Sequence, residues 1–494
     1  MELSPEPPTI SLEILQKHNT RSDCWIAIHS KVWDITSFID EHPGGSSILL
    51  SYAGAIATEL YDKFHAPEII TEELSSDKLM GYLEQSAEPI AAVDASQETV
   101  NAMESAFGET PLLESIISAQ DFEKEARQRL ASKTWAFYSS AATDLVTYRQ
   151  NKELVRRIML RPRILRNVSN VCTKRSILGY DSTVPFFVSP AAMARLAHPE
   201  GEKAIARAAS NRGVIQCISA NASFPLRSII SAAPESHPFF FQLYVNSDRS
   251  KTVEILKTAR ELGVKAILVT VDAPVPGKRE ADERAAQDVI VRSAISGGES
   301  SKDKKGSGFG RLMAQYIDKS LNWDDIAWLR EVCGDMAIVL KGVQTAEDVM
   351  MAAEYGVEGV MLSNHGGRSL DGSQASILVL LELRKHCPEV FDKMEIFIDG
   401  GFERGSDILK AIALGARAVG IGRPFLYSLI YGQEGAEHLI EILQDELQTS
   451  MMLAGITSLE QAGPRLVNTQ DIDHLVDNGE RPVTRNDRRI LSKL

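Results

Sequence analysis

The stretch EIFIDGGFERGSDILKAIALGARAVGIGRP, residues 395–424, decides the fold class of this chain. It holds two short apolar runs, 395–401 and 418–424, on either side of a segment with helical periodicity. That segment begins with polar residues and ends near a glycine, as helices commonly do. A strand, a helix and a second strand in this order predict an α/β fold with parallel strands.

The same alternation recurs on the N-terminal side of this stretch. Helical patterns of similar length occupy 199–213, 250–263 and 345–356, each between two apolar runs. Including the opening stretch, the chain has eight such runs: 184–192, 213–222, 238–246, 265–274, 337–343, 359–367, 395–401 and 418–424. Eight strand–helix units predict a TIM (β/α)8 barrel, whose active site lies at the C-terminal ends of the strands.

The chain of 494 residues is longer than one hydrophobic core usually organises, and its composition divides it into blocks. Residues 1–84 form a compact block, which we expect to be a small separate domain. An acidic linker rich in Ala, Ser and Glu follows at 85–111. We expect the barrel at 112–465 and a C-terminal tail at 466–494.

The overall composition excludes several classes of protein. With 44% hydrophobic and 24% charged residues, the chain is typical of globular proteins, and it has no apolar run of the roughly 20 residues that cross a bilayer. The formal net charge of -14 argues against nucleic acid as a partner, because phosphate binding requires clustered Lys and Arg. We therefore expect neither a membrane nor a nucleic acid partner.

The cysteines and the chain ends indicate a compartment. The five cysteines have no C-x-x-C or zinc-type spacing, which predicts buried thiols without disulfides. Residues 1–8 carry neither a signal nor a transit pattern. The C-terminal Ser492-Lys493-Leu494 matches a peroxisomal import tripeptide, so we expect the protein in the peroxisome rather than in the cytoplasm.

One connection of the expected barrel is unusually long, since about sixty residues separate the fourth and fifth runs. Within it, residues 293–310 are rich in Gly, Ser and Lys and show no apolar period, which predicts a mobile loop. The loop is either an active-site lid or a tolerated insertion. Its place at the catalytic end of the barrel favours the lid.

Two histidines in the first block point to a haem. Residues 33–45, WDITSFIDEHPGG, are typical of a strand, a helix and a Pro-Gly-Gly turn, and a second histidine follows in LYDKFHAP, 60–67. This arrangement resembles the cytochrome b5-like domains. The resemblance implies that His42 and His65 bind the iron of haem b from both sides. Such an iron has no open position, so it transfers single electrons.

The sixth run ends in Ser363-Asn364-His365-Gly366-Gly367-Arg368. Together with the barrel, this motif resembles the FMN-dependent L-2-hydroxy acid dehydrogenase and oxidase family, and with the haem block it resembles the flavocytochrome b2 type. The resemblance covers residues 8 to about 465, and it implies FMN and haem b as cofactors and a homotetramer. A Rossmann site is not indicated, because no G-x-G-x-x-G opens a helix after a first strand.

Oxidation of a 2-hydroxy acid requires a base, a cation for the substrate carboxylate and an electron acceptor. The resemblance implies that His365 is the base and that Asp272, at the end of the fourth run, orients it. It implies that Arg279 and Arg368 bind the carboxylate, because a planar guanidinium can form two parallel hydrogen bonds with it. Tyr244 is expected to hydrogen-bond the substrate hydroxyl.

Lys341 ends the fifth run, which is otherwise apolar, and burying its charge requires an anionic partner. The resemblance places it beside the N1/O2 edge of the flavin; a salt bridge within the barrel is the alternative. Asp399-Gly400-Gly401 and Gly422-Arg423 end the last two runs, where such barrels usually bind phosphate. The other flavin contacts that the resemblance implies are Ser189, Ala191, Ser219, Gln242, Thr270 and Ser363.

The chain departs from the family pattern at five positions. Phe137 replaces a tyrosine that donates to the substrate carboxylate, which favours a bulkier or less polar acid than lactate. Asn221 occupies a pocket-wall position that is apolar in the lactate enzymes. Ala191 and Ala141 are small changes near the flavin ring. Glu403 replaces the first phosphate arginine, and we expect it to turn away from the phosphate and to reduce FMN affinity.

Three functions fit these residues. The leading one is the oxidation of a small L-2-hydroxy acid at FMN, with electrons relayed through the haem to an acceptor. The second is an oxidase that passes the electrons to oxygen and releases hydrogen peroxide. The third is a non-catalytic flavin or haem electron carrier, which the complete catalytic set disfavours.

Overall fold

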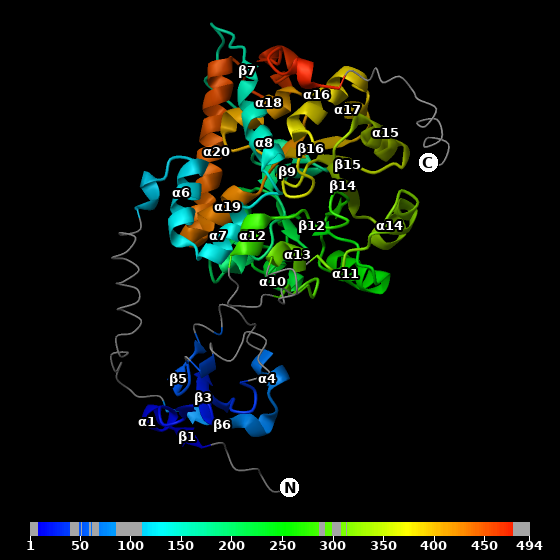
Figure 1. Cartoon of the computed structure of the whole chain (residues 1–494). Coiled ribbons are helices and arrows are strands. Elements are labelled where there is room, and N and C mark those ends of the chain that lie inside the picture. The colour runs from blue at the N-terminus through cyan, green and yellow to red at the C-terminus, as the bar shows by residue number, and fades with distance from the viewer. Residues whose placement is uncertain are drawn as a thin grey trace.

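The computed structural model describes residues 8–39, 49–50, 52–58, 61, 69–84, 111–285, 292–298, 308–312 and 314–477. Figure 1 shows two bodies, a small one built by the N-terminal residues and a large one that begins near residue 111. The small body contains a mixed sheet, and the large one contains a closed barrel. Each is described by itself below.

Eight parallel strands close into a barrel in the large body. Each strand falls within one of the eight predicted apolar runs, so the predicted TIM barrel is confirmed. Nearly all strand residues are buried, because helices cover the outside and side chains fill the inside. The strands are β10 (Phe186–Val188), β11 (Gln216–Ser219), β12 (Phe239–Leu243), β13 (Ala266–Thr270), β14 (Ala337–Val343), β15 (Gly359–Leu362), β16 (Glu395–Asp399) and β17 (Ala418–Ile421).

The strand register brings the predicted flavin contacts to one end of the barrel. Ser219 lies opposite Gln242, and Thr270 lies opposite Lys341. The barrel closes between its first and last strands, where Val188 pairs with Ile421. Because the strands are parallel, all their C-terminal ends lie at the same end.

Four predicted helical segments are confirmed as α9 (Gly201–Arg212), α11 (Arg249–Glu261), α15 (Ala346–Glu354) and α18 (Gly405–Ala413). Their ends follow local chemistry. The side chain of Thr345 accepts a hydrogen bond from the Asp348 amide at 3.2 Å at the start of α15. Gly213 ends α9 with a φ of 65°. The other helices that follow strands are α10 (Leu226–Ile230), α14 (Asp325–Cys333), α16 (Ser376–His386), α17 (Val390–Lys393) and α19 (Arg423–Ser428).

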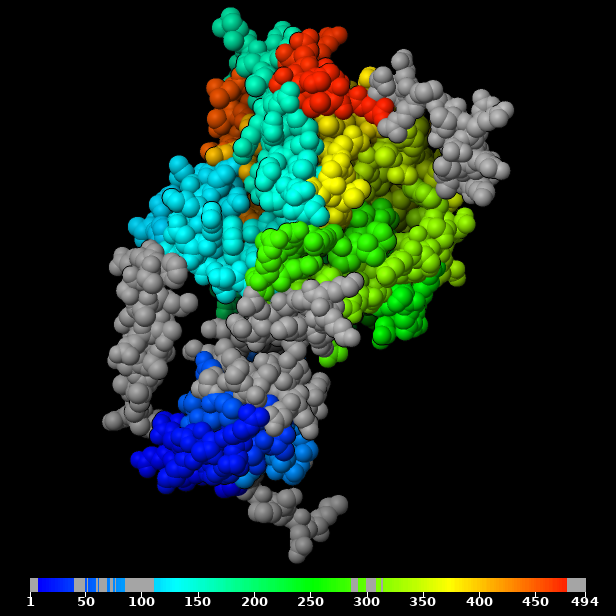
Figure 2. Space-filling view, in the orientation of Figure 1, coloured from blue at the N-terminus to red at the C-terminus, as the bar shows by residue number. Residues whose placement is uncertain are grey.

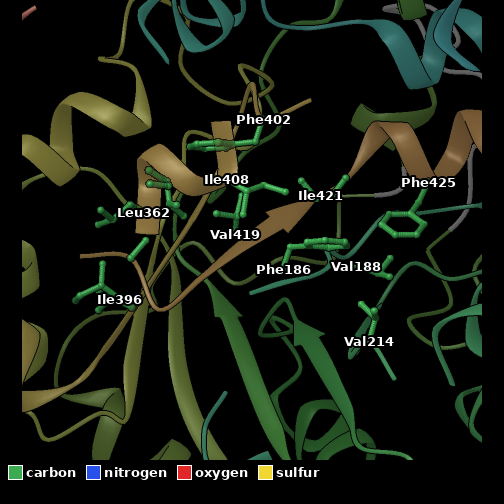
Figure 3. Close-up of a cluster of buried hydrophobic side chains, with 14 of the residues drawn as sticks. Phe186, Val188, Val214, Leu362, Ile396, Phe402, Ile408, Val419, Ile421 and Phe425 are labelled. Carbon is green, nitrogen blue, oxygen red and sulfur yellow. The ribbon is translucent and has the colours of Figure 1, made fainter. Parts of the chain in front are cut away.

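The hydrophobic core of the large body has two layers. Inside the barrel, Phe187, Phe240 and Phe397 pack with smaller apolar side chains. The second layer lies between the strands and the surrounding helices. There, side chains on the outer face of the strands pack against the helices, as Figure 3 shows for Phe186 and Val188. The alternation along each strand separates the layers, because successive side chains point to opposite faces.

Segments before and after the barrel pack on it. Helices α6 (Ala119–Arg129), α7 (Ser132–Ser139) and α8 (Val146–Arg157) come first, and α20 (Gly432–Ala454) follows the last strand. Strand β7 (Met159–Leu160) pairs with β18 (Val467–Asn468), and in Figure 2 the red C-terminal segment lies against the teal segment that carries β7. The predicted barrel boundary at residue 465 stays a prediction, and the packed chain continues past it to the buried Val476.

The long connection after β13 contains the short helices α12 (Glu280–Arg284) and α13 (Phe309–Leu312). Of the loop predicted at 293–310, residues 299–307 lie outside the described residues. Its first part is fixed, contrary to the expectation of a free loop, because Ser293 Oγ donates to the backbone oxygens of Ala220 and Ala222 at 3.0 and 3.3 Å. The lid remains a prediction.

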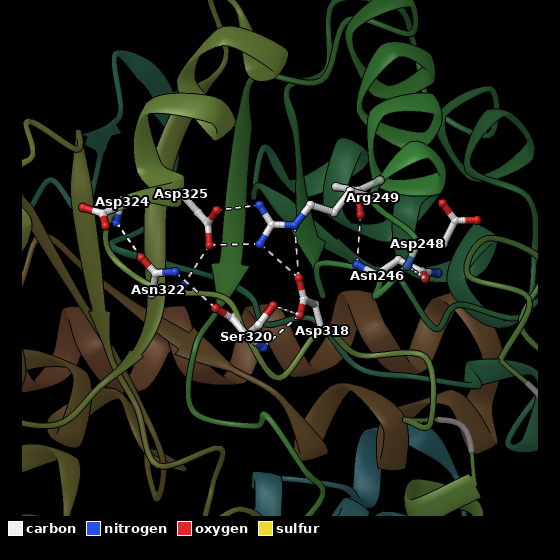
Figure 4. Close-up of polar contacts among 9 residues, drawn as sticks. Asn246, Asp248, Arg249, Asp318, Ser320, Asn322, Asp324 and Asp325 are labelled. Carbon is white, nitrogen blue, oxygen red and sulfur yellow. Dashed lines mark hydrogen bonds and ion pairs between the residues drawn. The ribbon is translucent and has the colours of Figure 1, made fainter.

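The end of this connection is held by one arginine (Figure 4). Arg249, at the start of α11, donates to Asp318 Oδ2 at 3.1 Å and to both carboxylate oxygens of Asp325 at 2.5 and 3.0 Å. Ser320 caps the same carboxylate of Asp318 through its amide and its hydroxyl. The chain is thus fixed where it returns to the barrel.

The small body has a sheet with the strand order β1-β6-β4-β3-β2, and β5 pairs with β3. Its largest apolar cluster includes Trp33, Ile35 and Ile39 on one face of the sheet. The described elements are β1 (Thr9–Ile10), α1 (Leu12–Leu15), β2 (Asn19–Thr20), β3 (Asp23–Ile28), β4 (Lys31–Asp34), β5 (Ala55–Ile56), α4 (Ile69–Glu73) and β6 (Leu79–Leu83). The predicted ligands His42 and His65 lie outside the described residues.

The cysteines correct one expectation. All five are unpaired, and Cys24, Cys217, Cys333 and Cys387 are buried as predicted, but Cys172 is exposed. Cys172 lies in the segment before the barrel, where apolar periodicity gives no guide to burial. None of the helices in the described ranges has both the length and the apolar character that a membrane span requires.

Candidate active site

One cavity opens at the C-terminal end of the barrel. Residues at the ends of all eight strands or directly after them line it, together with parts of α6, α7 and α8. The predicted catalytic and substrate residues on its wall are Phe137, Tyr244, Arg279, His365 and Arg368, and the predicted cofactor residues are Ser189, Ala191, Ser219, Gln242, Thr270, Lys341, Asp399, Gly400, Gly401, Gly422 and Arg423. The structure therefore brings together residues that are far apart in the sequence.

The predicted base is held on both sides of its ring. His365 Nδ1 lies 3.1 Å from Asp272 Oδ1, and His365 Nε2 lies 3.3 Å from the Tyr244 hydroxyl. An ionised carboxylate only accepts hydrogen bonds, so the Asp272 contact places a proton on Nδ1. In the neutral ring Nε2 then carries the lone pair, and it is the atom that can accept a proton.

The surroundings favour the neutral form of this ring. Burial lowers the pKa of His365, and the nearby Lys341 lowers it further, whereas Asp272 acts in the opposite direction. Burial alone would raise the pKa of Asp272, but His365 and Lys341 outweigh it and hold that pKa below its ordinary value. At neutral pH the pair is therefore a neutral imidazole beside a carboxylate.

The loop that carries His365 has an unusual backbone. His365 has a φ of 60°, and Gly366 and Gly367 follow at 61° and 78°. Gly367 is required, because a Cβ there would lie 2.8 Å from the backbone of Tyr148. The two glycines let the loop turn tightly against α8 and aim the imidazole into the cavity.

Three arginines lie near one another on the cavity wall: Arg279 and Arg368, which are predicted to bind the substrate carboxylate, and Arg423. Arg368 donates to the backbone oxygens of Phe137 and Tyr138 at 2.8 Å each, and no described residue accepts a hydrogen bond from Arg279 Nε. Burial lowers the pKa of Arg368, and its neighbours Arg279 and Arg423 add to this effect. Buried like charges of this kind are stabilised by an anion.

The residue that departs from the family pattern, Phe137, is 4% exposed and faces apolar neighbours. Its ring lies 5.6 Å from that of Phe309, and the Arg368 guanidinium lies 5.4 Å from its centroid. Phe137 thus contributes a ring face near the carboxylate site but no donor.

The residues on the first four strand ends form a polar network and leave groups free. Ser219 Oγ donates to Gln242 Oε1 at 3.2 Å, and Gln242 Nε2 donates to Thr270 Oγ1 at 3.0 Å. Ser189 Oγ is buried without a partner among the described residues. Ala191 lines the same wall and offers only a methyl group.

The opposite side of the cavity offers a buried cation and further free groups. Lys341 is 3% exposed, and its Nζ lies 3.4 Å from Ser363 Oγ. No carboxylate of the described residues lies within salt-bridge distance of this ammonium. The alternative prediction, a salt bridge within the barrel, is therefore not found among these residues. Asp399 Oδ1 is likewise buried without a described partner. These groups fit a flavin, because its ring presents both donors and acceptors at its polar edge.

The ends of β16 and β17 form a glycine cradle suited to a phosphate. Gly400 and Gly401 have φ values of 97° and 88°, and a Cβ on Gly401 would lie 2.4 Å from the backbone of Asn151. Arg423 lines the cavity beside them and donates to the backbone oxygens of Tyr138, Gly366 and Ser140 at 3.0–3.1 Å. Backbone amides and one guanidinium can therefore reach an anion.

Sequence reasoning marked Glu403 beside this cradle but missed its charged neighbours, Lys152 and Glu123. Glu403 remains on the cavity wall, where its Oε1 lies 2.5 Å from Lys152 Nζ. Lys152 also lies 3.5 Å from Glu123, and its Nζ is 5.0 Å from the centre of the Tyr148 ring. Glu123 and Lys152 come from α6 and α8, whose charged positions have the pattern of an ordinary solvated helix face, so no sequence signal marks these two residues.

In the small body, the half-buried apolar residues Phe38, Leu49, Leu50 and Tyr52 lie on segments next to the predicted ligand His42. Apolar side chains of this kind suit the flat face of a haem. Because His42 and His65 lie outside the described residues, their role stays a prediction.

The comparisons with known proteins agree with this geometry. Residues 126–469 match the FMN-dependent dehydrogenase family, and residues 11–84 match the cytochrome b5-like heme/steroid binding domain. The first match covers well over half of the chain.

This chain belongs to the FMN-dependent dehydrogenase family.

Its relatives include enzymes that align with nearly the whole chain and others that align with about 71% of it. The chain is 40% identical to L-lactate dehydrogenase (cytochrome) of Wickerhamomyces anomalus over 479 residues, which is 96% of this chain and 81% of the relative. It is 39% identical to Glycolate oxidase 3 of Oryza sativa subsp. indica, over 71% of this chain and 95% of the relative. Among solved structures, a flavocytochrome b2 variant with benzoylformate is 42% identical, with a TM-score of 0.69, and the match covers 79% of this chain and 96% of that one.

The predicted family, enzyme class and cofactors are thus confirmed. The family member is an FMN-dependent oxidoreductase that acts on a CH–OH group, with FMN in the barrel and haem b in the N-terminal domain. The individual roles of the site residues remain predictions that the geometry fits.

The predicted peroxisomal location is wrong. The relatives of the cytochrome-linked type are enzymes of the mitochondrial intermembrane space, and this family member resembles one of them over 479 residues. A match of three residues arises by chance far more readily than a likeness of that length. Ser492-Lys493-Leu494 also lies outside the described residues.

Proposed function

We propose that this family member oxidises an L-2-hydroxy acid to the 2-keto acid in the barrel cavity and that a cytochrome receives the electrons through the haem. The observation that carries the proposal is the position of His365 Nε2. It faces the same cavity as Arg279 and Arg368, while Asp272 fixes the opposite side of the ring at 3.1 Å.

Each of these cavity residues has a different role in the reaction. Arg279 and Arg368 bind the substrate carboxylate and so orient the carbon that bears the hydroxyl. Tyr244 hydrogen-bonds the substrate hydroxyl, and His365 Nε2 accepts a proton as the substrate loses two electrons. Asp272 stabilises the imidazolium that forms. When bound, FMN would supply the acceptor for the two electrons and for the second hydrogen of the CH–OH group.

The test is anaerobic mixing of the holoenzyme with L-2-hydroxy acids in a stopped-flow instrument. Flavin bleaching followed by haem reduction is the expected sequence. His365→Gln should slow bleaching by about 10²- to 10⁴-fold, the usual contribution of a general base. Absence of bleaching with every acid would refute the proposal and favour the non-catalytic electron carrier.

The oxidase is the second candidate, because the barrel alone resembles Glycolate oxidase 3 over 71% of this chain. It predicts rapid reoxidation of the flavin by oxygen with release of hydrogen peroxide. If the reduced enzyme passes its electrons to a cytochrome faster than to oxygen, the oxidase is excluded.

The matched ranges 11–84 and 126–469 support the proposed domain bounds, and the homotetramer stays a prediction.

A further inference from the structure

Three polar side chains meet beside the cavity: Asn221, which lines it, and Ser296 and Tyr316, which contact Asn221. Ser296 Oγ donates to Asn221 Oδ1 at 2.5 Å, and the Tyr316 hydroxyl donates to the same oxygen at 3.2 Å. Asn221 is 8% exposed and lines the cavity. The three residues come from the end of β11 and from two separate parts of the long connection after β13.

The hydrogen bonds fix the orientation of the Asn221 amide. Ser296 Oγ already accepts from the Gly298 amide at 3.1 Å, so its own proton is available for Asn221 Oδ1. Two hydroxyl donors therefore share the oxygen of the amide. No described residue accepts a hydrogen bond from Asn221 Nδ2. The two N–H groups of Asn221 Nδ2 therefore remain available as hydrogen-bond donors.

This donor lies close to the predicted catalytic residues. Asn221 and Tyr244 both line the cavity, each two residues after the paired Ser219 and Gln242. Tyr316, which holds the Asn221 amide, lies near enough to Tyr244 that Tyr244 contributes to its raised pKa. Tyr244 in turn contacts His365. A substrate whose hydroxyl lies at Tyr244 therefore extends its side chain toward the wall that includes Asn221.

The cavity also has apolar lining residues that suit a substrate side chain. Ala191, Ala192, Ile317 and Phe137 line it, and the Phe137 ring packs against Phe309 behind it. The cations of the site also disfavour a positively charged side chain. The wall thus combines an apolar surface with one amide donor.

We propose that Asn221 recognises an oxygen acceptor on the substrate side chain, so that the preferred substrates are L-2-hydroxy acids that carry a carbonyl, carboxylate or hydroxyl oxygen beyond C3. Ser296 and Tyr316 are positioning residues that hold the amide oxygen and thereby aim its nitrogen. This inference rests on the proposed function. It concerns the choice of acid, not the chemistry.

The test compares two acids of nearly equal shape, L-2-hydroxy-4-oxopentanoate and L-2-hydroxy-4-methylpentanoate, in which a carbonyl oxygen replaces a methyl group. Anaerobic flavin bleaching in the holoenzyme gives the substrate Kd and the limiting rate for each. The wild type should favour the oxo acid by about three- to tenfold in the ratio of rate to Kd, the effect of one neutral hydrogen bond.

Asn221→Leu keeps the side-chain size and removes the donor, so it should abolish or reverse this preference, mainly through Kd. Tyr316→Phe should reduce it in part. Asn211→Leu, an identical change at an exposed position on α9, should leave it unaltered. If Asn221→Leu loses its flavin, Asn221→Ala provides the same comparison.

The failures are distinguishable. If neither acid bleaches the flavin in the wild type, and no other 2-hydroxy acid does, the proposed function fails. If both acids bleach it equally well, or if Asn221→Leu keeps the preference for the oxo acid, the proposed function stands and the role of Asn221 is overturned.

Discussion

At the scale of single residues, the phosphate end of the cavity has an unusual balance of charge. Lys152 faces two carboxylates, with Glu403 at 2.5 Å and Glu123 at 3.5 Å. Burial alone would lower the pKa of Lys152, but Glu403 outweighs it and raises that pKa. The ammonium is therefore charged, and it offsets an anion that would otherwise repel a phosphate group.

Substitutions at this pair should change FMN affinity in opposite directions. Glu403→Gln removes a negative charge near the phosphate and frees Lys152, so FMN should bind on the order of tenfold more tightly. Lys152→Met removes the ammonium between two carboxylates and leaves only Arg156 beside Glu403, so FMN should bind more weakly. Fluorescence titration of the apoprotein measures both.

Riboflavin, which lacks the phosphate, is the control ligand for this pair. Its affinity should change little in either variant. Equal changes for riboflavin and FMN would mean that the pair acts on folding of the cavity and not on the phosphate.

The pH dependence of the reaction should follow His365. Because burial lowers its pKa, the imidazole is neutral and competent at neutral pH, and activity should fall only on the acid side of the ordinary histidine pKa, about 6.5. Asp272 raises this pKa, so Asp272→Asn should move the acid limb to still lower pH. The same change should lower the maximal rate, because the imidazolium loses its partner.

Steady-state kcat/KM across pH measures this shift, with Asp371→Asn as a control carboxylate outside the cavity. An acid limb that moves to higher pH in Asp272→Asn would contradict the assignment of His365 as the titrating base.

At the scale of elements, α8 supports the catalytic loop through a reciprocal pair of amides. Asn151 Nδ2 donates to Asn364 Oδ1, and Asn364 Nδ2 donates to Asn151 Oδ1, both at 2.8 Å. Asn364 Oδ1 also accepts from the Gly367 amide at 2.9 Å. The pair lies completely inside the protein and joins a helix before the barrel to the turn that carries His365.

Breaking this pair should loosen the loop. Asn151→Ala leaves a buried amide without its partner, which should lower the free energy of unfolding by about 1–3 kcal/mol. The bleaching rate should fall, because His365 is held less well. Thermal or urea unfolding and stopped-flow bleaching measure the two effects, and a variant as stable and as fast as the wild type would contradict the supporting role.

At the scale of the whole molecule, the two domains carry out different steps of the electron transfer. The barrel holds the substrate residues, and the haem domain supplies a centre that passes single electrons. His42→Ala should leave flavin bleaching by substrate unchanged while it abolishes the reduction of a cytochrome. Absorbance of the haem and flavin bands in one anaerobic trace distinguishes the two steps.

Intact cytochrome reduction in His42→Ala would show that electrons leave the flavin by another route. The corresponding His65→Ala variant should behave in the same way, since both histidines are predicted ligands of one iron.

Much of the fold was predictable, because it depends on patterns that are local in sequence. The eight apolar runs became eight strands, since parallel barrel strands are buried on both faces and therefore read as continuous apolar segments. The family resemblance singled out His365, Asp272, Tyr244 and Lys341. The barrel brings His365, Tyr244 and Lys341 to one cavity, because all its C-terminal strand ends lie together, and Asp272 contacts His365.

What the sequence by itself determined, then, is the architecture, the cofactor family and the residues that follow each strand. Only the tertiary structure decided which side chains meet across long separations. Lys152 and Glu403, Asn151 and Asn364, and Asn221 with Ser296 and Tyr316 lie on different elements, and no periodic pattern connects them. Such contacts arise from the packing of whole elements, which local periodicity does not specify.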